Sequence, residues 1–203
     1  MISLPDRLVL FDYGDVISEP QSNADRAALV AEAGVPPEAF WHGYQTHRDE
    51  LDAGRIDAEE YWRRVGGELG ADWDDAAVQR LWTLDVRSWV SANPAVVHIL
   101  VELAAGGTRL ALLSNAAPEY ASLFRFAPTG RFFERILVSG ELRMLKPEPE
   151  IYRHAADELG IDPRRIVFVD NREENVRGAE AVGMTGHVFT GAAALRGFLA
   201  SLS

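Results

Sequence analysis

Three short apolar runs, each followed by one polar residue, constrain the fold of this chain most strongly. Uninterrupted apolar runs of about four residues are typical of strands buried on both faces of a parallel sheet. The strong runs are Leu8–Phe11 before Asp12, Leu110–Leu113 before Ser114 and Ile166–Val169 before Asp170, and the weaker ones are Ile136–Val138 before Ser139 and His187–Phe189 before Thr190. The pattern predicts that these segments form one parallel sheet.

Helical stretches lie between these runs. The clearest are Asn93–Gly107, Pro149–Gly160 and Glu173–Val182, the last followed by Gly183. Proline is favoured in the first turn of a helix and glycine just beyond its last turn, so these residues support the limits. Strand and helix therefore alternate as in βαβ units, which predicts an α/β fold.

Residues 18–87 break this alternation, because they show helical periodicity and no convincing strand. Ser22-x-x-Asp25 and Asp57-x-x-Glu60 resemble capping boxes. All five tryptophans lie in this segment or just after it: Trp41, Trp62, Trp73, Trp82 and Trp89. The segment is predicted to be an all-helical insertion. Its tryptophans either fill the core of a small bundle or belong to a lid.

The charge balance limits the partners. The chain has 203 residues, with 31 Asp and Glu against 20 Lys and Arg, a formal net charge of −11. Such a surface repels nucleic acid and anionic lipid at long range, so we expect neither as a partner. No apolar run approaches the length of a membrane span, and the expected location is cytoplasmic.

The residue inventory limits the chemistry. There is no cysteine, which excludes disulfides, thiolate catalysis and cysteine zinc sites, and the five histidines form no metal-type pair. Carboxylates and hydroxyls are therefore expected to carry any reaction. Lys146 is the single lysine among nineteen arginines, which points to a specific task for it.

The polar residues after the strong runs are the main clue to function. Ligands of open α/β sheets bind at the carboxyl ends of the strands, where Asp12, Ser114 and Asp170 are predicted to meet. An aspartate after a strand is often only a helix cap or a turn residue. Four features in one order strengthen the functional interpretation: Phe11-Asp12-Tyr13-Gly14-Asp15-Val16, Leu113-Ser114-Asn115, Lys146-Pro147 and Phe168-Val169-Asp170-Asn171 with Asn175 beyond.

With these four motifs the chain resembles the haloacid dehalogenase superfamily of phosphatases over nearly its whole length. The runs Lys146–Tyr152 and Asn175–Ala179 are typical of its small sugar-phosphatase-like branch. The resemblance implies a Rossmann-like three-layer core with a small all-helical cap inserted after the first strand. The expected core comprises residues 1–17 and 88–203, and the expected cap comprises residues 18–87.

The resemblance also implies a function: hydrolysis of a small phosphorylated metabolite through an aspartyl-phosphate intermediate, with Mg²⁺ as cofactor. Its site residues are Asp12 as nucleophile; Ser114, Asn115 and Lys146 around the phosphate; Asp12, the Gly14 carbonyl, Asp170 and Asn171 around the metal; and Asp15 and Asn175 in support. A carboxylate can attack phosphorus, but an anion attacking an anion needs the neutralising charge of Mg²⁺ and Lys146.

Two positions depart from the family pattern. Gly14 stands where the usual general acid, a second aspartate, is expected, and Asp15 follows one place later. Losing a positioned acid costs about 10²–10⁴-fold in rate, mainly with poor leaving groups, so anomeric sugar phosphates should be preferred. Asn171 stands where many relatives have a second acid, so metal affinity should fall unless Asp170 also reaches the metal.

The cap is expected to contribute substrate contacts through His47 and Arg48, although Arg48 and Asp52, four residues apart, could simply pair on a helix face. Two rival functions stay open. One is a metal-independent haloacid dehalogenase, against which Asp170 and the lack of an aromatic residue two places after Asp12 argue. The other is a weakly active or inactive binding module, because Gly14 and Asn171 are off pattern. The protein is expected to be a monomer or a homodimer.

Overall fold

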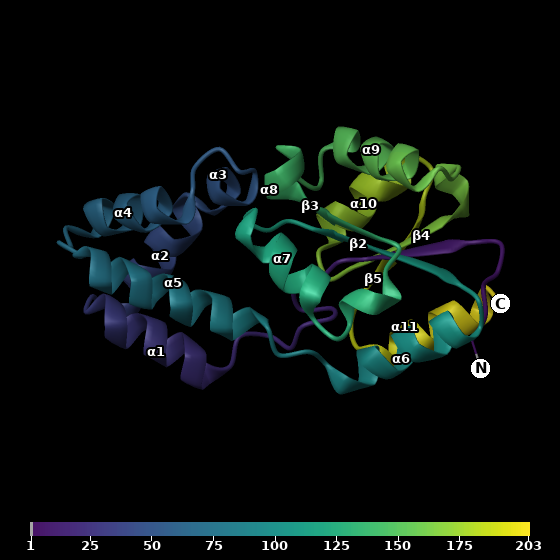
Figure 1. The fold of residues 1–203 in the computed structure, drawn as a ribbon, viewed down its shortest axis with the longest axis horizontal. Coiled ribbons are helices and arrows are strands. Elements are labelled where there is room, and N and C mark those ends of the chain that lie inside the picture. Colours follow the sequence, from purple (N-terminus) through teal and green to yellow (C-terminus); the bar gives the residue numbers. More distant parts are fainter. Residues whose placement is uncertain (1) are drawn as a thin grey trace.

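The computed structural model describes residues 2–203 and contains a five-stranded parallel sheet (Figure 1). Its strands are β1 (Leu8–Phe11), β2 (Arg109–Ser114), β3 (Arg135–Val138), β4 (Ile166–Asp170) and β5 (Thr185–Val188). Their spatial order is β3-β2-β1-β4-β5, and every neighbouring pair is parallel. The predicted α/β class is confirmed, including the two weaker strands, whose limits differ by one or two residues.

Helices cover both faces of the sheet, which gives three layers. On one face lie α6 (Pro94–Ala105), α7 (Glu119–Phe126) and α11 (Ala192–Ser201), and on the other lie α9 (Pro149–Leu159) and α10 (Glu173–Ala181) (Figure 1). Side chains of β1 alternate between these layers, because Val9 and Phe11 pack with the first group and Leu8 and Leu10 with the second. All four are fully buried, as continuous apolar strands require.

Short elements connect these layers. They are η1 (Gly130–Phe132), α8 (Ser139–Leu142) directly after β3, and η2 (Pro163–Arg165) directly before β4. Because α8 begins where β3 leaves the sheet, its first residues lie at the carboxyl edge of the strands.

Residues between β1 and α6 form helices only: α1 (Asn23–Ala33), α2 (Pro37–Thr46), α3 (Arg48–Asp52), α4 (Ala58–Leu69) and α5 (Asp75–Trp89). They lie at the end of the molecule away from the C-terminus (Figure 1). Ser22 and Asp57 cap α1 and α4 through their side chains, as the capping pattern predicts. The helical segment is thus as expected, while its division from the core at residues 18 and 87 stays a prediction.

Aromatic side chains fill the centre of this bundle. Trp62 and Tyr61 are buried, and the ring of Trp62 lies 6.4 Å from that of Phe40 and 6.3 Å from that of Trp73. The other tryptophans are partly buried and pack against the same cluster. Trp41, Trp62 and Trp73 therefore serve the core of the bundle, which was one of the two interpretations, whereas Trp89 lies beside Gly14 in the loop after β1.

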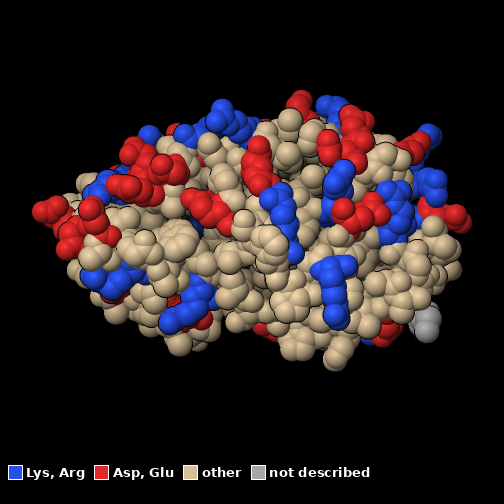
Figure 2. Space-filling view, viewed as in Figure 1, with Lys and Arg blue, Asp and Glu red and all other residues tan. Residues whose placement is uncertain are grey.

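Charges are mixed over the surface. On the face shown in Figure 2, Asp and Glu gather at the end formed by α4 and α5, and elsewhere basic side chains are separated by acidic and neutral ones. Within residues 2–203 no helix is both long enough and apolar enough to cross a membrane.

The bundle touches the core at one close main-chain contact. Gly54, just after α3, has a φ of 62°, and a Cβ built on it would lie 2.2 Å from the carbonyl oxygen of Gly140 in α8. Beside this contact, Ser139 donates a hydrogen bond to the carbonyl of Asp52. A side chain at position 54 would therefore push α8 and the end of α3 apart.

This contact makes a stability prediction. We expect Gly54→Ala to lower the free energy of unfolding by the cost of a left-handed alanine, about 1–2 kcal/mol, plus about 1–3 kcal/mol for overpacking. Gly34→Ala is the matched control, because Gly34 has a similar φ of 66° with no atom near the added Cβ. Urea titrations of both variants measure the difference, and equal losses would contradict the contact.

Candidate active site

Three polar side chains meet at the carboxyl edge of the sheet. Asp12 follows β1, and Ser114 and Asp170 are the last residues of β2 and β4, the two strands that flank β1. All three are buried, with 7%, 3% and 0% of their surface exposed. From β1 the chain forms β2 and β3 on one side and then crosses to the other side of β1 to form β4 and β5, so this edge is a topological switch point where ligands bind.

Lys146 joins two of these residues. Its Nζ donates to Oδ1 of Asp12 and Oδ2 of Asp170, at 2.7 Å each, and to the carbonyl of Leu113 at 3.0 Å. Its side chain is 1% exposed. The single lysine of the chain is therefore a buried cation between two carboxylates, consistent with the specific task expected from its rarity.

Lys146, Asp12 and Asp170 form a buried trio, and the pKa values of Asp12 and Lys146 depend on the other members. Burial raises the pKa of Asp12 to about 6; Lys146 opposes the rise, and Asp170 adds to it. Burial disfavours the charged form of Lys146, but Asp12 and Asp170 outweigh this effect and raise its pKa. At neutral pH the site therefore holds an ionised Asp12 beside a protonated lysine.

Asn115 holds the main chain of Lys146. Its Nδ2 donates to the Lys146 carbonyl, and its Oδ1 accepts from the Lys146 N–H, both at 2.9 Å. Both ends of the side-chain amide are therefore engaged with the lysine. Asn115 therefore positions Lys146. Its predicted contact with phosphate stays a prediction. Ser114 lies at the site as the buried last residue of β2.

Asp170 is saturated by protein donors. Its Oδ1 accepts from the Arg172 N–H at 2.8 Å, and the amide Nδ2 of Asn175 contacts Oδ1 and Oδ2 at 3.1 and 3.0 Å. Together with Lys146, these donors hold both oxygens. Asn175 thus orients Asp170, as its predicted supporting role implies, and a metal bond from Asp170 would displace a donor.

The other side of Asp12 is formed by the loop after β1. Asp15 has a φ of 57°, its N–H donates to Ser18 Oγ at 3.0 Å, and its Oδ2 accepts from Nδ2 of Asn171 at 3.4 Å. Its second oxygen, Oδ1, is buried without a partner among the described residues, and burial raises the pKa of Asp15. A Cβ added at Gly14 would lie 3.9 Å from the ring of Trp89, so it would clash with no neighbour.

These residues fit a hard cation in part. Among residues 2–203 there is no cluster of three His, Cys, Asp or Glu side chains that could hold a metal. Oxygen donors are nevertheless present in Asp12, the amide of Asn171 and the orphaned oxygen of Asp15, and Mg²⁺ is bound by one or two carboxylates plus water and substrate. The fit therefore rests on few protein ligands, and the metal set Asp12, Gly14, Asp170 and Asn171 stays a prediction.

The two cap residues expected to contact substrate are engaged inside the cap. His47 lies 2.9 Å from Glu68, and Arg48 pairs with Asp52 at 3.2 Å and with the buried Asp85 at 3.0 Å. The pairing of Arg48 with Asp52 on a helix face is confirmed. A substrate contact from either residue stays a prediction.

Ser139 is a residue that the sequence interpretation left without a role. Its Oγ accepts from the N–H of Ala116 at 2.9 Å and donates to the carbonyl of Asp52. It thus ties the loop after β2 to the end of α3. The available signal was its place as the polar residue directly after a strand, the same pattern that marks Asp12, Ser114 and Asp170.

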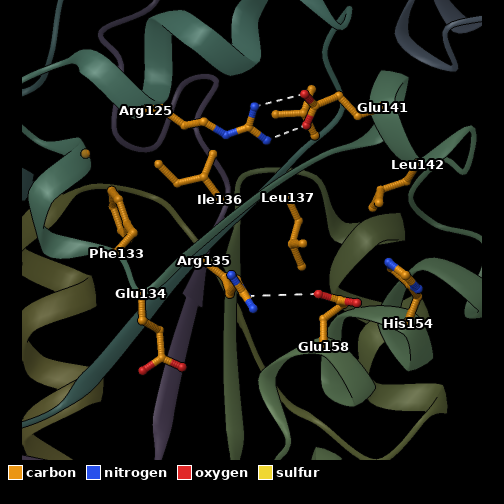
Figure 3. A pocket seen from close by; sticks show the side chains of 12 residues that line it. Arg125, Phe133, Glu134, Arg135, Ile136, Leu137, Glu141, Leu142, His154 and Glu158 are labelled. Carbon is orange, nitrogen blue, oxygen red and sulfur yellow. Dashed lines mark hydrogen bonds and ion pairs between the residues drawn. The ribbon is translucent and has the colours of Figure 1, made fainter.

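A cavity of about 620 Å³ lies elsewhere, beside the edge strand β3 (Figure 3). Its lining includes Arg125 paired with Glu141 and Arg135 paired with Glu158. None of the predicted site residues lines it. Because four of its charged side chains form two ion pairs and none of the polar residues at the strand ends lines it, this cavity does not compete with the edge of the sheet as the candidate site.

Comparisons with known proteins show the family of the chain. Residues 7–183 match the family model of the haloacid dehalogenase-like hydrolases. The sesquiterpene phosphatase AstK of Aspergillus oryzae is 27% identical over 183 residues, which cover 89% of this chain and 88% of that protein. An (S)-2-haloacid dehalogenase 4A of Burkholderia cepacia is 30% identical over 95 residues, 46% of this chain and 41% of that protein.

A solved structure has the same fold. The HAD family enzyme bt-2542 of Bacteroides thetaiotaomicron, in complex with magnesium and inorganic phosphate, superimposes with a TM-score of 0.72 at 21% identity. The superposition covers 89% of this chain and 92% of that one.

The buried trio makes a stability prediction. We expect Lys146→Met to lower the free energy of unfolding at neutral pH by about 3–5 kcal/mol, because two carboxylates then share a buried site without a cation. The loss should shrink as the pH falls, because Lys146 lowers the pKa of Asp12 and, without it, that carboxyl takes up a proton at a higher pH than in the wild type. Urea titrations at several pH values test both parts.

The control for this prediction is Arg153→Met, which removes an exposed cation whose side chain is 61% exposed. Its expected cost is within about 0.5 kcal/mol at every pH. A pH-independent loss in Lys146→Met would mean that the variant fails through packing and not through uncompensated charge.

Proposed function

The chain belongs to the haloacid dehalogenase-like hydrolase family, and from this premise we propose that it is a Mg²⁺-dependent phosphatase of small phosphomonoesters. The observation that carries the proposal is the ion pair of Lys146 with Asp12 at the carboxyl edge of the sheet. Support also comes from the relatives, because the named phosphatase matches over 88% of its length and the named dehalogenase over 41%. The magnesium and phosphate of the bt-2542 complex are consistent with the same chemistry.

The first half of the reaction uses Asp12 as the nucleophile. A pKa of about 6 leaves its carboxylate ionised at neutral pH. One oxygen attacks phosphorus, the bond from phosphorus to the leaving oxygen breaks, and an aspartyl phosphate forms. Lys146 donates to Oδ1 and leaves Oδ2 outside the ion pair, so the lysine fixes the carboxylate and places its charge near the phosphoryl oxygens.

The second half returns the enzyme to its starting state. Water attacks the phosphorus of the aspartyl phosphate, inorganic phosphate departs, and the carboxylate of Asp12 is restored. Ser114 lies one strand away and donates its hydroxyl to the phosphoryl group in both halves. Bound Mg²⁺ would supply Lewis-acid neutralisation of the phosphoryl charge, held by Asp12 and the loops after β1 and β4.

Gly14 shapes the choice of substrate. It supplies no proton to the leaving oxygen, so that oxygen must depart as a stable anion or take its proton from water. Phosphates on anomeric carbons have less basic leaving groups than phosphates of ordinary sugar alcohols. The proposed substrate is therefore a small metabolite of the former kind, such as a sugar phosphorylated at its anomeric oxygen.

The activity test is phosphate release from p-nitrophenyl phosphate and a panel of sugar phosphates, with and without Mg²⁺. We expect metal-dependent turnover that Asp12→Asn abolishes, because the amide is not a nucleophile. Asp6→Asn is the matched control: it removes the same charge at a side chain that is 97% exposed, before β1 and away from the site.

Other results would favour the rival functions. Halide release from 2-chloropropionate without metal, with no phosphate release, would favour a dehalogenase. Phosphate binding by calorimetry without any turnover would favour a binding module. Either result would overturn the phosphatase proposal.

The role of Gly14 gives a separate prediction. We expect Gly14→Asp to raise kcat with sugar alcohol phosphates by up to about 10²–10⁴-fold, because it restores an acid for the leaving group. The rate with p-nitrophenyl phosphate should change far less, since that leaving group needs no proton. A Cβ at position 14 would lie 3.9 Å from the Trp89 ring, an ordinary van der Waals distance, so the first side-chain atom causes no clash. Equal gains on both substrates would contradict the assignment.

A further inference from the structure

We propose that Asp15 supplies the second carboxylate of the metal site, in place of the charge that Asn171 lacks. The inference deepens the proposed function and rests on it, because it concerns the cation of the same site. Three observations carry it: the direction of the Asp15 side chain, its orphaned oxygen, and the saturation of Asp170.

The loop after β1 turns Asp15 toward the loop after β4. The main chain of Asp15 is left-handed, with a φ of 57°, a conformation that aspartate tolerates better than most residues. The carbonyl of Tyr13 accepts from Ile17 and Ser18, and the N–H of Asp15 donates to the Ser18 hydroxyl, so the turn is well defined. Its carboxylate consequently lies against Asn171, 156 residues further along the chain.

The contact with Asn171 arranges two oxygens. Oδ2 of Asp15 accepts from Nδ2 of Asn171, which leaves the amide oxygen of Asn171 free to bind a cation. Oδ1 of Asp15 is buried with no partner among the described residues. A buried acceptor without a donor is costly, and a divalent cation would satisfy it. Arg172 lowers the pKa of Asp15, but burial raises it by more.

Asp170 does not supply this second carboxylate. Its two oxygens already accept from Lys146, Asn175 and the Arg172 N–H. The loop after β4 therefore offers the cation a neutral amide from Asn171, and the negative charge has to come from another segment. Asp15 is the carboxylate whose side chain contacts that amide.

The experiment measures Mg²⁺ binding to the metal-free protein by calorimetry, with no substrate present. We expect Asp15→Asn to raise the dissociation constant for Mg²⁺ by at least about 10-fold, the scale seen when a carboxylate that supports a metal site is removed. Asp15→Asn with Asn171→Asp should recover most of the affinity, because the carboxylate returns on the other side of the contact. Asp6→Asn removes the same charge far from the site and should bind as the wild type does.

Two results would overturn the inference. One is an Asp15→Asn variant that binds Mg²⁺ as the wild type does, even if its kcat falls, since Asp15 would then act on the leaving group. The other is a weakened Asp15→Asn variant that Asn171→Asp does not rescue, since the loss would then come from the loop and not from the charge. The melting temperatures of the metal-free variants establish that each one is folded.

The wild type separates this inference from the proposed function. If the wild-type protein binds no Mg²⁺ at millimolar concentration, the metal-dependent phosphatase fails and this inference fails with it. If the wild type binds Mg²⁺ and turns over phosphate esters while Asp15→Asn binds equally well, only the inference about Asp15 fails.

Discussion

The structure depends on one buried cation. Lys146 lies between Asp12 and Asp170 with 1% of its side chain exposed, so its charge is tolerable only while both carboxylates stay in place. The trio joins the end of β1, the end of β4 and the segment after α8, which are distant in sequence. Its formal charge is −1, one lysine against two aspartates, so it cannot by itself bind a phosphate dianion. The trio itself supplies no surplus positive charge, and that is the electrostatic argument for the Mg²⁺ that we propose beside Asp12.

The parts of this fold that could be predicted from the sequence are those encoded locally. Buried strands need unbroken apolar runs, and helices end at glycine or begin at a capping side chain such as Ser22, so both leave a signal a few residues long. The convergence of Asp12, Ser114 and Asp170 followed from the strands, because parallel strands share one carboxyl edge. The family resemblance added the roles, which composition and spacing could not supply.

What could not be predicted depends on which groups tertiary packing brings together. The sequence marks Asn115 as a polar residue near a strand end, but only the fold shows its amide held by the main chain of Lys146. Likewise, the sequence presents Arg48 as a cation in a cap and a candidate for substrate, while the fold surrounds it with Asp52 and Asp85. The same holds for Asp15, whose neighbour Asn171 comes from the far end of the chain.

The way in which the helices join the sheet has an evolutionary consequence. Ser18 and Ala92 form an antiparallel bridge, flanked by hydrogen bonds from Glu19 to Ser91 and from Asn93 to Ile17. The chain therefore leaves the sheet and returns to it at adjacent points. The segment between those points can lengthen, shrink or be exchanged for another module while β1 and Asp12 stay where they are. With such an attachment, the helices between β1 and α6 can change in evolution while the residues at the carboxyl edge of the sheet stay the same.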